Sequence, residues 1–268
     1  MRYWLFLLGF LLAINLKVFA EEGGTTAQFL WVPETTIETS FKAQMGVGLL
    51  DSPGLTGGRG TPITNYFGVN YAVTPDLGIS IGLPLAGTLS NGNDDYGIGN
   101  IQMGTEYVIP LDRLSFGLGV NLSLPTAQTR ATLGVSTRQF VQFVDDQFAV
   151  SPYVVLSYVR DRLVLSIDLG TDLELFTERT AGIDRFENIL FYDGAAAMSI
   201  VQNIWGTIEF GGFSTLTYDQ NMTQLFAGPG IRYQDHEISL GFHLLAPFRR
   251  PSRDIIDFIT ACEFRVLF

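Results

Sequence analysis

The sequence predicts an all-β protein: a transmembrane, antiparallel, up-and-down β-barrel of about 12 strands that follows a cleaved signal peptide. Three observations lead to this prediction. The first residues have the composition of a secretory signal, apolar residues alternate with small or polar residues along most of the remaining chain, and the last predicted strand ends in phenylalanine. Strands with one apolar and one polar face are typical of barrels that cross a lipid bilayer.

The first 20 residues resemble a secretory signal peptide. Arg2 gives a basic start, residues 4–16 are mostly apolar, and Val18 and Ala20 supply the small side chains that a signal peptidase reads. The apolar run is shorter than the ~20 residues of a membrane-spanning helix. We therefore expect cleavage near Ala20. Lys17 is unusually close to that position, so an uncleaved anchor is the alternative interpretation.

Cleavage would divide the chain into three parts. Residues 1–20 are the predicted signal peptide, 21–38 a short periplasmic N-terminal segment, and 39–268 the barrel. Without the two basic residues of the signal, 14 Lys and Arg remain against 27 Asp and Glu, a net charge of −13. Such a chain has no electrostatic attraction for nucleic acid. A single cysteine, Cys262, means that no intrachain disulfide holds the fold.

The alternation of apolar residues has a period of two, which is the period of a β-strand. It is clearest in residues 77–87, 114–124 and 163–175. A soluble β-sandwich would also alternate, but its strands are usually ~5–6 residues long. The segments here match the ~9–11 residues of a tilted membrane strand. Their connections also alternate between short and long, as in outer-membrane barrels.

The predicted barrel has twelve strands joined by five short turns and six long loops. The strands are expected at 39–49, 63–73, 77–87, 96–109, 114–124, 146–159, 163–175, 187–201, 204–216, 223–233, 237–247 and 255–268. Both termini then lie on the side of the short turns, which is the periplasmic side in such barrels. Four tyrosines near those turns, Tyr71, Tyr107, Tyr158 and Tyr233, are expected to face lipid at the membrane–water interface.

The last strand carries the most specific signal. Phe264, Val266 and Phe268 share one face with Cys262, whereas Glu263 and Arg265 lie on the other face. This pattern resembles the C-terminal signal that the barrel-assembly machinery recognises in bacterial outer-membrane proteins. We therefore expect Phe264, Val266 and Phe268 to form an assembly signal, with outer-membrane lipids and that machinery of a Gram-negative cell as partners.

The polar faces of the predicted strands define a candidate lumen. Its expected lining residues are Lys42, Gln44, Asn100, Gln102, Glu106, Asn121, Asp168, Asp172, Asp193, Glu209, Arg232, His243, Glu263 and Arg265. Because carboxylates predominate, one hypothesis is an acidic pore that attracts cations. The other is a lumen closed by hydrogen bonds and ion pairs. Since the first and last strands meet when a barrel closes, Lys42 is expected beside Glu263, in a salt-bridge cluster near the periplasmic mouth.

Loop 125–145 leaves three arrangements open. It could fold into the lumen, form an outer rim, or extend the following strand through its aromatic end, which is the arrangement we favour. No catalytic or metal-binding pattern stands out. His236 lies in a turn, His243 is expected inside the wall as a hydrogen-bonded histidine, and no serine or cysteine is placed with a histidine and an acid. We expect no enzyme activity, metal or cofactor, and a lipid hydrolase is disfavoured.

Residues 96–107, YGIGNIQMGTEY, resemble a strand of the outer-membrane family described as "putative meta-pathway of phenol degradation". This chain has Asn100 where that family has an acidic residue, and Glu106 where it has lysine. The resemblance implies a small barrel that passes hydrophobic or aromatic compounds, and it assigns no binding residues. The sequence as a whole predicts an outer-membrane channel for small solutes. The alternative is a closed structural or surface-interaction barrel that acts through its extracellular loops.

Overall fold

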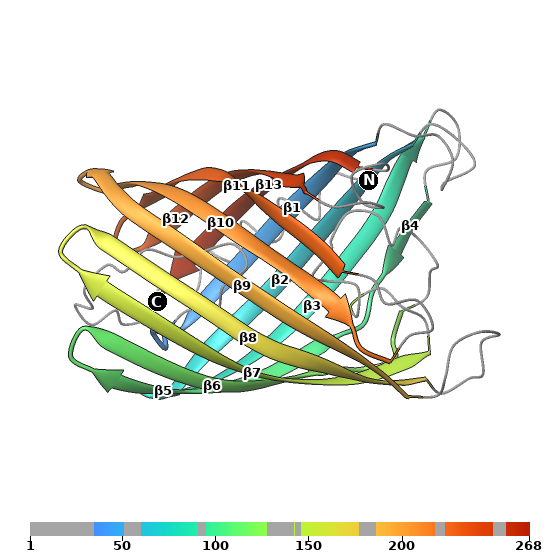
Figure 1. Cartoon of the computed structure of the whole chain (residues 1–268), viewed down its shortest axis with the longest axis horizontal. Coiled ribbons are helices and arrows are strands. Elements are labelled where there is room, and N and C mark those ends of the chain that lie inside the picture. Colours follow the sequence, from blue (N-terminus) through green and yellow to red (C-terminus); the bar gives the residue numbers. More distant parts are fainter. Residues whose placement is uncertain are drawn as a thin grey trace.

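A computed structural model describes residues 35–50, 60–90, 95–127, 142, 146–176, 186–217, 223–248 and 256–268. Regular structure in these residues is almost entirely β-strand (Figure 1). The strands are β1 (Ser40–Leu50), β2 (Gly60–Thr74), β3 (Leu77–Ser90), β4 (Asp95–Ile98), β5 (Gln102–Leu111), β6 (Leu114–Ser123), β7 (Gln147–Arg160), β8 (Leu163–Phe176), β9 (Phe186–Val201), β10 (Ile204–Thr215), β11 (Thr223–Gln234), β12 (Ile238–Pro247) and β13 (Ile256–Leu267). No described helix is long and apolar enough to cross a membrane.

The strands form one closed antiparallel sheet. Each strand from β5 to β13 pairs with the next along the chain, β1 pairs with both β2 and β13, and β2 pairs with β3. Because β4 and β5 both pair with β3, the wall has twelve strand positions. The strands are steeply tilted, as closure of a barrel requires (Figure 1). The predicted twelve-stranded, up-and-down barrel is confirmed, and the strand bounds agree within a few residues.

One predicted strand is wrong in detail, because the segment expected at 96–109 is interrupted at residues 99–101. Leu85 of β3 pairs with Ile98, and Gly82 of β3 pairs with Gln102, so an extra residue is accommodated on the β4–β5 side. This irregularity reverses the alternation. Tyr96 and Ile98 are exposed on the outer face, whereas Gln102, which has the same parity, lies on the inner face.

The two faces of the wall differ as the alternation predicts. On β8, every second side chain from Leu163 to Leu169 is exposed, while the residues between them are buried. The exposed outer side chains around the barrel are mainly Ile, Leu, Val, Phe and Tyr. Most buried polar side chains belong to the inner face. An apolar outer surface of this kind suits contact with lipid. The pairing of β1 with β13 also closes the sheet, so that the first and last strands have partners on both sides.

The short turns lie at one end of the barrel. Asp112, Asp161 and Asn203, with φ of 56°, 50° and 66°, adopt the left-handed conformation there, which Asn and Asp tolerate better than most residues. The C-terminus lies at this end (Figure 1). The four tyrosines predicted for the girdle all lie on outward positions near these turns, and Tyr71 is 56% exposed. The predicted aromatic girdle is therefore present.

Candidate functional site

The inner face of the barrel collects the polar side chains predicted for the lumen. Nine of them are buried: Asn100, Asp168, Asp172, Asp193, Glu209, Arg232, His243, Glu263 and Arg265. The other five are half-buried: Lys42, Gln44, Gln102, Glu106 and Asn121. Strand register brings most of the charged ones into two groups, one on β1, β11, β12 and β13 and the other on β8 and β9.

The first group surrounds Glu263. Its Oε1 accepts a hydrogen bond from Arg232 Nη1 at 2.7 Å, and its Oε2 lies 3.0 Å from Lys42 Nζ and 2.5 Å from Gln44 Nε2. Arg265 Nη2 is 3.9 Å from Oε1. The predicted cluster is thus formed across the seam where β1 meets β13. Glu106 lies apart from this group, on β5, where it accepts a hydrogen bond from Tyr153 Oη at 3.0 Å.

Strand register explains how Arg232 reaches Glu263 across β12. Arg232 is opposite Gly241, and Gly241 is opposite Glu263. Because Gly241 has no side chain, the guanidinium lies over it and also donates to Ser239 Oγ at 2.7 Å. Next to this group, His243 Nδ1 lies 3.1 Å from Glu209 Oε1, and both side chains are buried. His243 therefore has the predicted inner-wall position, but the expected hydrogen bond is not formed, because neither ring nitrogen meets hydrogen-bond geometry with a described residue.

The second group is acidic and follows the pairing of β8 with β9. Asp168 is directly opposite Asp193, and Glu174 is directly opposite Glu187. All four carboxyl groups are buried. Like charges at directly opposed positions repel each other. This arrangement favours a local positive charge, from a cation or a basic group, on that part of the inner wall.

An apolar patch adjoins these carboxylates and extends over β7, β8, β9 and β10. It is formed by Tyr153, Val155, Val164, Ile189, Phe191, Ala195, Ala197, Trp205 and Phe213. Sequence reasoning missed these residues because it selected only polar side chains for the lumen. The sequence did contain a signal in β9, where the consecutive residues Leu190 and Phe191 place apolar side chains on both faces of the strand. The inner wall is therefore polar and aromatic together.

Glycines on the inner wall accommodate the large side chains beside them. A Cβ at Gly119 would overlap the ring of Tyr153, and a Cβ at Gly170 would overlap the ring of Phe191. Tyr66 lies in the same way over Gly68 and Gly82. Glycine at these positions therefore relieves crowding on the inner face.

The interruption between β4 and β5 holds part of the loop that follows β6. Asn100 Oδ1 accepts hydrogen bonds from the backbone N–H groups of Thr126 at 3.0 Å and Ala127 at 2.8 Å. Asn100 N donates to Gln142 O at 2.6 Å, and Gln142 Nε2 donates to Gln102 Oε1 at 3.0 Å. Gln142 therefore contacts an inner-face side chain. Most of loop 125–145 lies outside the described residues, so its arrangement stays open.

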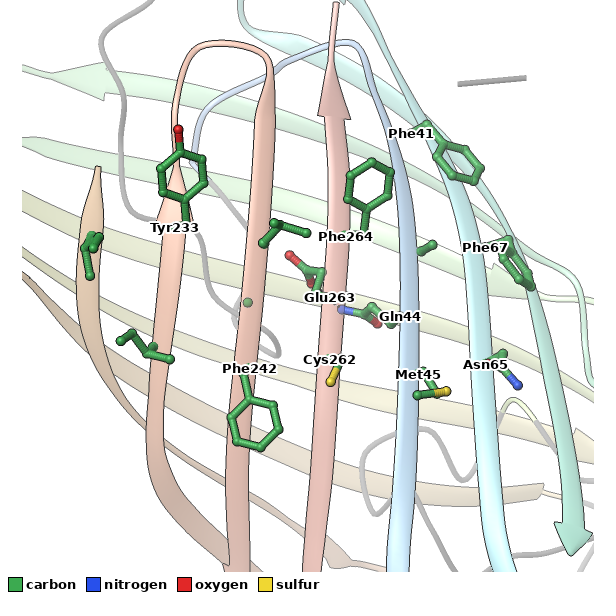
Figure 2. Close-up of a pocket in the computed structure, with 15 residues that line it drawn as sticks. Phe41, Gln44, Met45, Asn65, Phe67, Tyr233, Phe242, Cys262, Glu263 and Phe264 are labelled. Carbon is green, nitrogen blue, oxygen red and sulfur yellow. Dashed lines mark hydrogen bonds between the residues drawn. The ribbon is translucent and has the colours of Figure 1, made fainter. Parts of the chain in front are cut away.

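The outer face carries an apolar groove of about 610 Å³ over β11, β12, β13, β1 and β2 (Figure 2). Figure 2 shows the rings of Phe41, Phe67 and Phe264 around its end nearest the turns, with Phe242 and Cys262 further along the strands. Cys262 faces outward, as predicted. The groove is a valley between projecting aromatic side chains on the lipid-facing wall. Among the described residues, no group of three His, Cys, Asp or Glu side chains is placed to hold a metal ion.

Comparison with solved structures shows the fold to which the wall belongs. The chain is similar to an outer-membrane channel from Pseudomonas putida F1, with 10% identity and a TM-score of 0.65 over 91% of this chain and 100% of that one. It is also similar to the NanC porin, with 14% identity and a TM-score of 0.56 over 84% of this chain and 98% of that one. For the KdgM porin, the identity is 12% and the TM-score is 0.52, over 85% of this chain and 99% of that one. No family model and no curated protein matches the sequence. The chain has the fold of these outer-membrane β-barrels.

Proposed function

We propose that the protein is a narrow outer-membrane channel for small solutes, without catalytic activity. The observation that carries this proposal is the closed wall, whose outer face is apolar and whose inner face bears charged and aromatic side chains. A barrel of twelve strands falls between small packed barrels of eight and open porins of 16–18. The similarity in fold to porins and to an outer-membrane channel supports the same function.

The inner wall also supports a proposal about the solute. Asp168 and Asp172 are the inner-face residues on either side of Gly170 on β8, and Gly170 is directly opposite both Tyr153 and Phe191. Such a surface suits a small solute with an apolar or aromatic body and gives cations an electrostatic advantage. It agrees with the passage of aromatic compounds that the resemblance of residues 96–107 implies, and we propose membership of that family on the same grounds.

Planar-bilayer recording tests the channel. The purified, folded protein should give discrete conductance steps, and a salt gradient should give a reversal potential of cation-selective sign. Asp168→Asn, Asp172→Asn and Glu209→Gln together should reduce that selectivity. Asp161→Asn, which changes an exposed carboxylate in a short turn, is the matched control and should leave it unchanged. A folded barrel with neither conductance nor solute uptake in liposomes would refute the proposal.

The second candidate function is a closed barrel that acts through its extracellular loops. The near-complete burial of inner side chains such as Asp168 and Glu209 favours it. The loops concerned, 125–145 and 176–186, lie mostly outside the described residues. Deleting them separates the two functions, because a surface-interaction barrel would lose its partner while still inserting, whereas a channel would keep conducting.

A further inference from the structure

The exposed arginines of the described residues gather at one part of the short-turn end. Six Lys and Arg side chains belong to the described part of the chain, and three of these lie on the inner wall. The other three, Arg113, Arg160 and Arg162, are exposed at the two turns that join β5 to β6 and β7 to β8. The described short turns that follow β2, β9 and β11 contain no Lys or Arg. Strong positive charge on this rim is therefore confined to one place.

Strand pairing places these three arginines next to one another. β6 pairs with β7, and the backbone N–H of Val159 on β7 donates to Arg113 O at 2.8 Å. Arg113 thus lies beside the end of β7, where Arg160 is the last residue, and Arg162 follows two residues later in the turn. We call Arg113, Arg160 and Arg162 the arginine patch.

Two carboxylates in the same turns, Asp112 and Asp161, do not neutralise the arginine patch. Arg160 Nε lies 3.8 Å from Asp161 Oδ2, and the two side chains are 60% and 88% exposed. An ion pair of this length between solvated groups is weak. Three positive charges against two negative ones leave this part of the rim net positive, whereas the turn after β11 carries the acidic residues Asp235 and Glu237.

The arginine patch lies at the level where lipid head groups are expected. Arg160 is on the outward face of β7, two residues beyond Tyr158 of the aromatic girdle. Tyrosine rings prefer the membrane–water interface. With a rise of about 3.4 Å per residue, Arg160 is about 7 Å further along the strand than Tyr158, towards the water. Its guanidinium is thus at the depth of lipid phosphates rather than of acyl chains.

Exposed leucines adjoin the arginine patch on the outer wall. They are Leu111, Leu114 and Leu163, all on the strand ends that flank the two turns. Leu111 is directly opposite Leu114, and Leu163 is directly opposite Arg160. Guanidinium groups beside exposed apolar side chains match the two parts of a phospholipid, its charged head group and its acyl chains.

We propose that the arginine patch binds the head-group phosphate of an anionic phospholipid, whose acyl chains lie along the neighbouring leucines. The short turns of such barrels are periplasmic, so this lipid belongs to the periplasmic leaflet. The fork of an arginine matches the oxygens of a phosphate, and basic residues at a bilayer surface attract anionic lipids. The inference goes beyond the proposed channel, since lipid binding at the rim requires only the folded barrel.

Native mass spectrometry of the purified, folded protein in detergent tests this binding. The protein is titrated with phosphatidylglycerol and, separately, with phosphatidylcholine that has the same acyl chains. Phosphatidylglycerol should bind saturably and at least about fivefold more tightly, because its head group carries a net negative charge. Equal binding of the two lipids would overturn the proposal.

Three single variants locate the lipid at the arginine patch. Arg113→Gln and Arg160→Gln should each weaken phosphatidylglycerol binding about fivefold, the loss expected for one basic residue at an anionic surface. Asp161→Asn removes the carboxylate beside Arg160 and should strengthen binding, which mere damage to the turn would not do. Asn tolerates the left-handed conformation of this residue, whose φ is 50°. Heat-modifiable gel migration verifies folding, and if Arg160→Gln fails to fold, Arg113→Gln decides the result.

A matched control separates a local site from general attraction by charge. His236→Arg, added to Arg160→Gln, returns a positive charge to the same rim but in the exposed turn between β11 and β12. This double variant should bind phosphatidylglycerol as weakly as Arg160→Gln alone. Full recovery of binding in the double variant, or unchanged binding in both Arg→Gln variants, would overturn the proposal, whether or not the barrel conducts.

Discussion

Lys42 and Glu263 are joined across the seam where the barrel closes, with Nζ and Oε2 3.0 Å apart. Lys42 lies on the first strand and Glu263 on the last, and Glu263 also binds Arg232 and Gln44. The carboxylate on β13 therefore joins side chains of two other strands, β1 and β11. Since its side chain is fully buried, the charges around it depend on one another for compensation.

Glu263→Gln should lower the free energy of unfolding by about 3–5 kcal/mol, because it leaves Arg232 as a buried charge without its carboxylate. Lys42→Met should cost less, since Lys42 is 18% exposed. The measurement is urea-induced unfolding in lipid vesicles. Asp161→Asn, in an exposed pair with Arg160, serves as control and should change stability by less than about 1 kcal/mol. Equal effects of Glu263→Gln and Asp161→Asn would contradict this view of the seam.

The two faces of β13 should differ in their tolerance of charge. Phe264→Lys places an ammonium group on the lipid-facing wall, at a cost of up to about 2–4 kcal/mol depending on depth, whereas Leu267→Lys directs it to the inner side. Assembly, followed by heat-modifiable gel migration, should therefore suffer much more from Phe264→Lys. Similar damage from the two substitutions would show that the strand faces are assigned wrongly.

Deletion of Phe268 should reduce membrane insertion sharply while synthesis and export continue. The Phe268 N–H donates to Thr39 O at 2.9 Å, next to the start of β1, so the last residue helps to join the two ends of the sheet. An open sheet edge in hydrocarbon leaves backbone groups unsatisfied. The fraction of heat-modifiable protein in the membrane measures the effect. Normal insertion without Phe268 would show that this residue is not part of the assembly signal.

Gly119→Ala should destabilise the barrel by about 1–3 kcal/mol, because the new methyl group overlaps the Tyr153 ring. A double-mutant cycle tests the cause. In a Tyr153→Leu background the same substitution should cost clearly less. Gly206→Ala is the control, since its Cβ would meet only Ile200, at 3.2 Å. If the cost is the same in both backgrounds, the contact with Tyr153 is not its source.

Asp235 should make the turn between β11 and β12 dependent on pH. The backbone N–H groups of Glu237 and Ile238 each donate a hydrogen bond to the Asp235 carboxylate. These bonds hold the pKa of the Asp235 carboxyl below its ordinary value. A lowered pKa gives stability that is present above the unfolded-state pKa and lost as the pH falls through the folded-state pKa. Asp235→Ala should therefore cost about 0.5–1.5 kcal/mol at pH 7 and progressively less in acid. Unfolding curves of both proteins at pH 7 and in acid provide the measurement. A cost of Asp235→Ala that does not change with pH would contradict the role given to this carboxylate.

Alternation of apolar residues was sufficient to predict the barrel and the inner position of Lys42 beside Glu263, because side-chain direction and strand pairing both follow a period of two. It could not predict the interruption at 99–101, where the chain keeps an apparently continuous pattern. A signal was nevertheless present: Ile98 is apolar and Gln102 is polar at positions of the same parity. The Arg232–Glu263 ion pair over Gly241 depends on the register of three strands, which turn lengths alone do not determine.

Because large side chains lie over glycines on the inner wall, the inner surface of the barrel can be altered at one position at a time. Shortening Tyr153 or Tyr66 would uncover the backbone at Gly119 or Gly82 and leave a recess at that position. Since the neighbouring strands keep their own hydrogen bonds, the wall itself would retain its circumference. The inner surface could thus be reshaped locally without changing the number of strands.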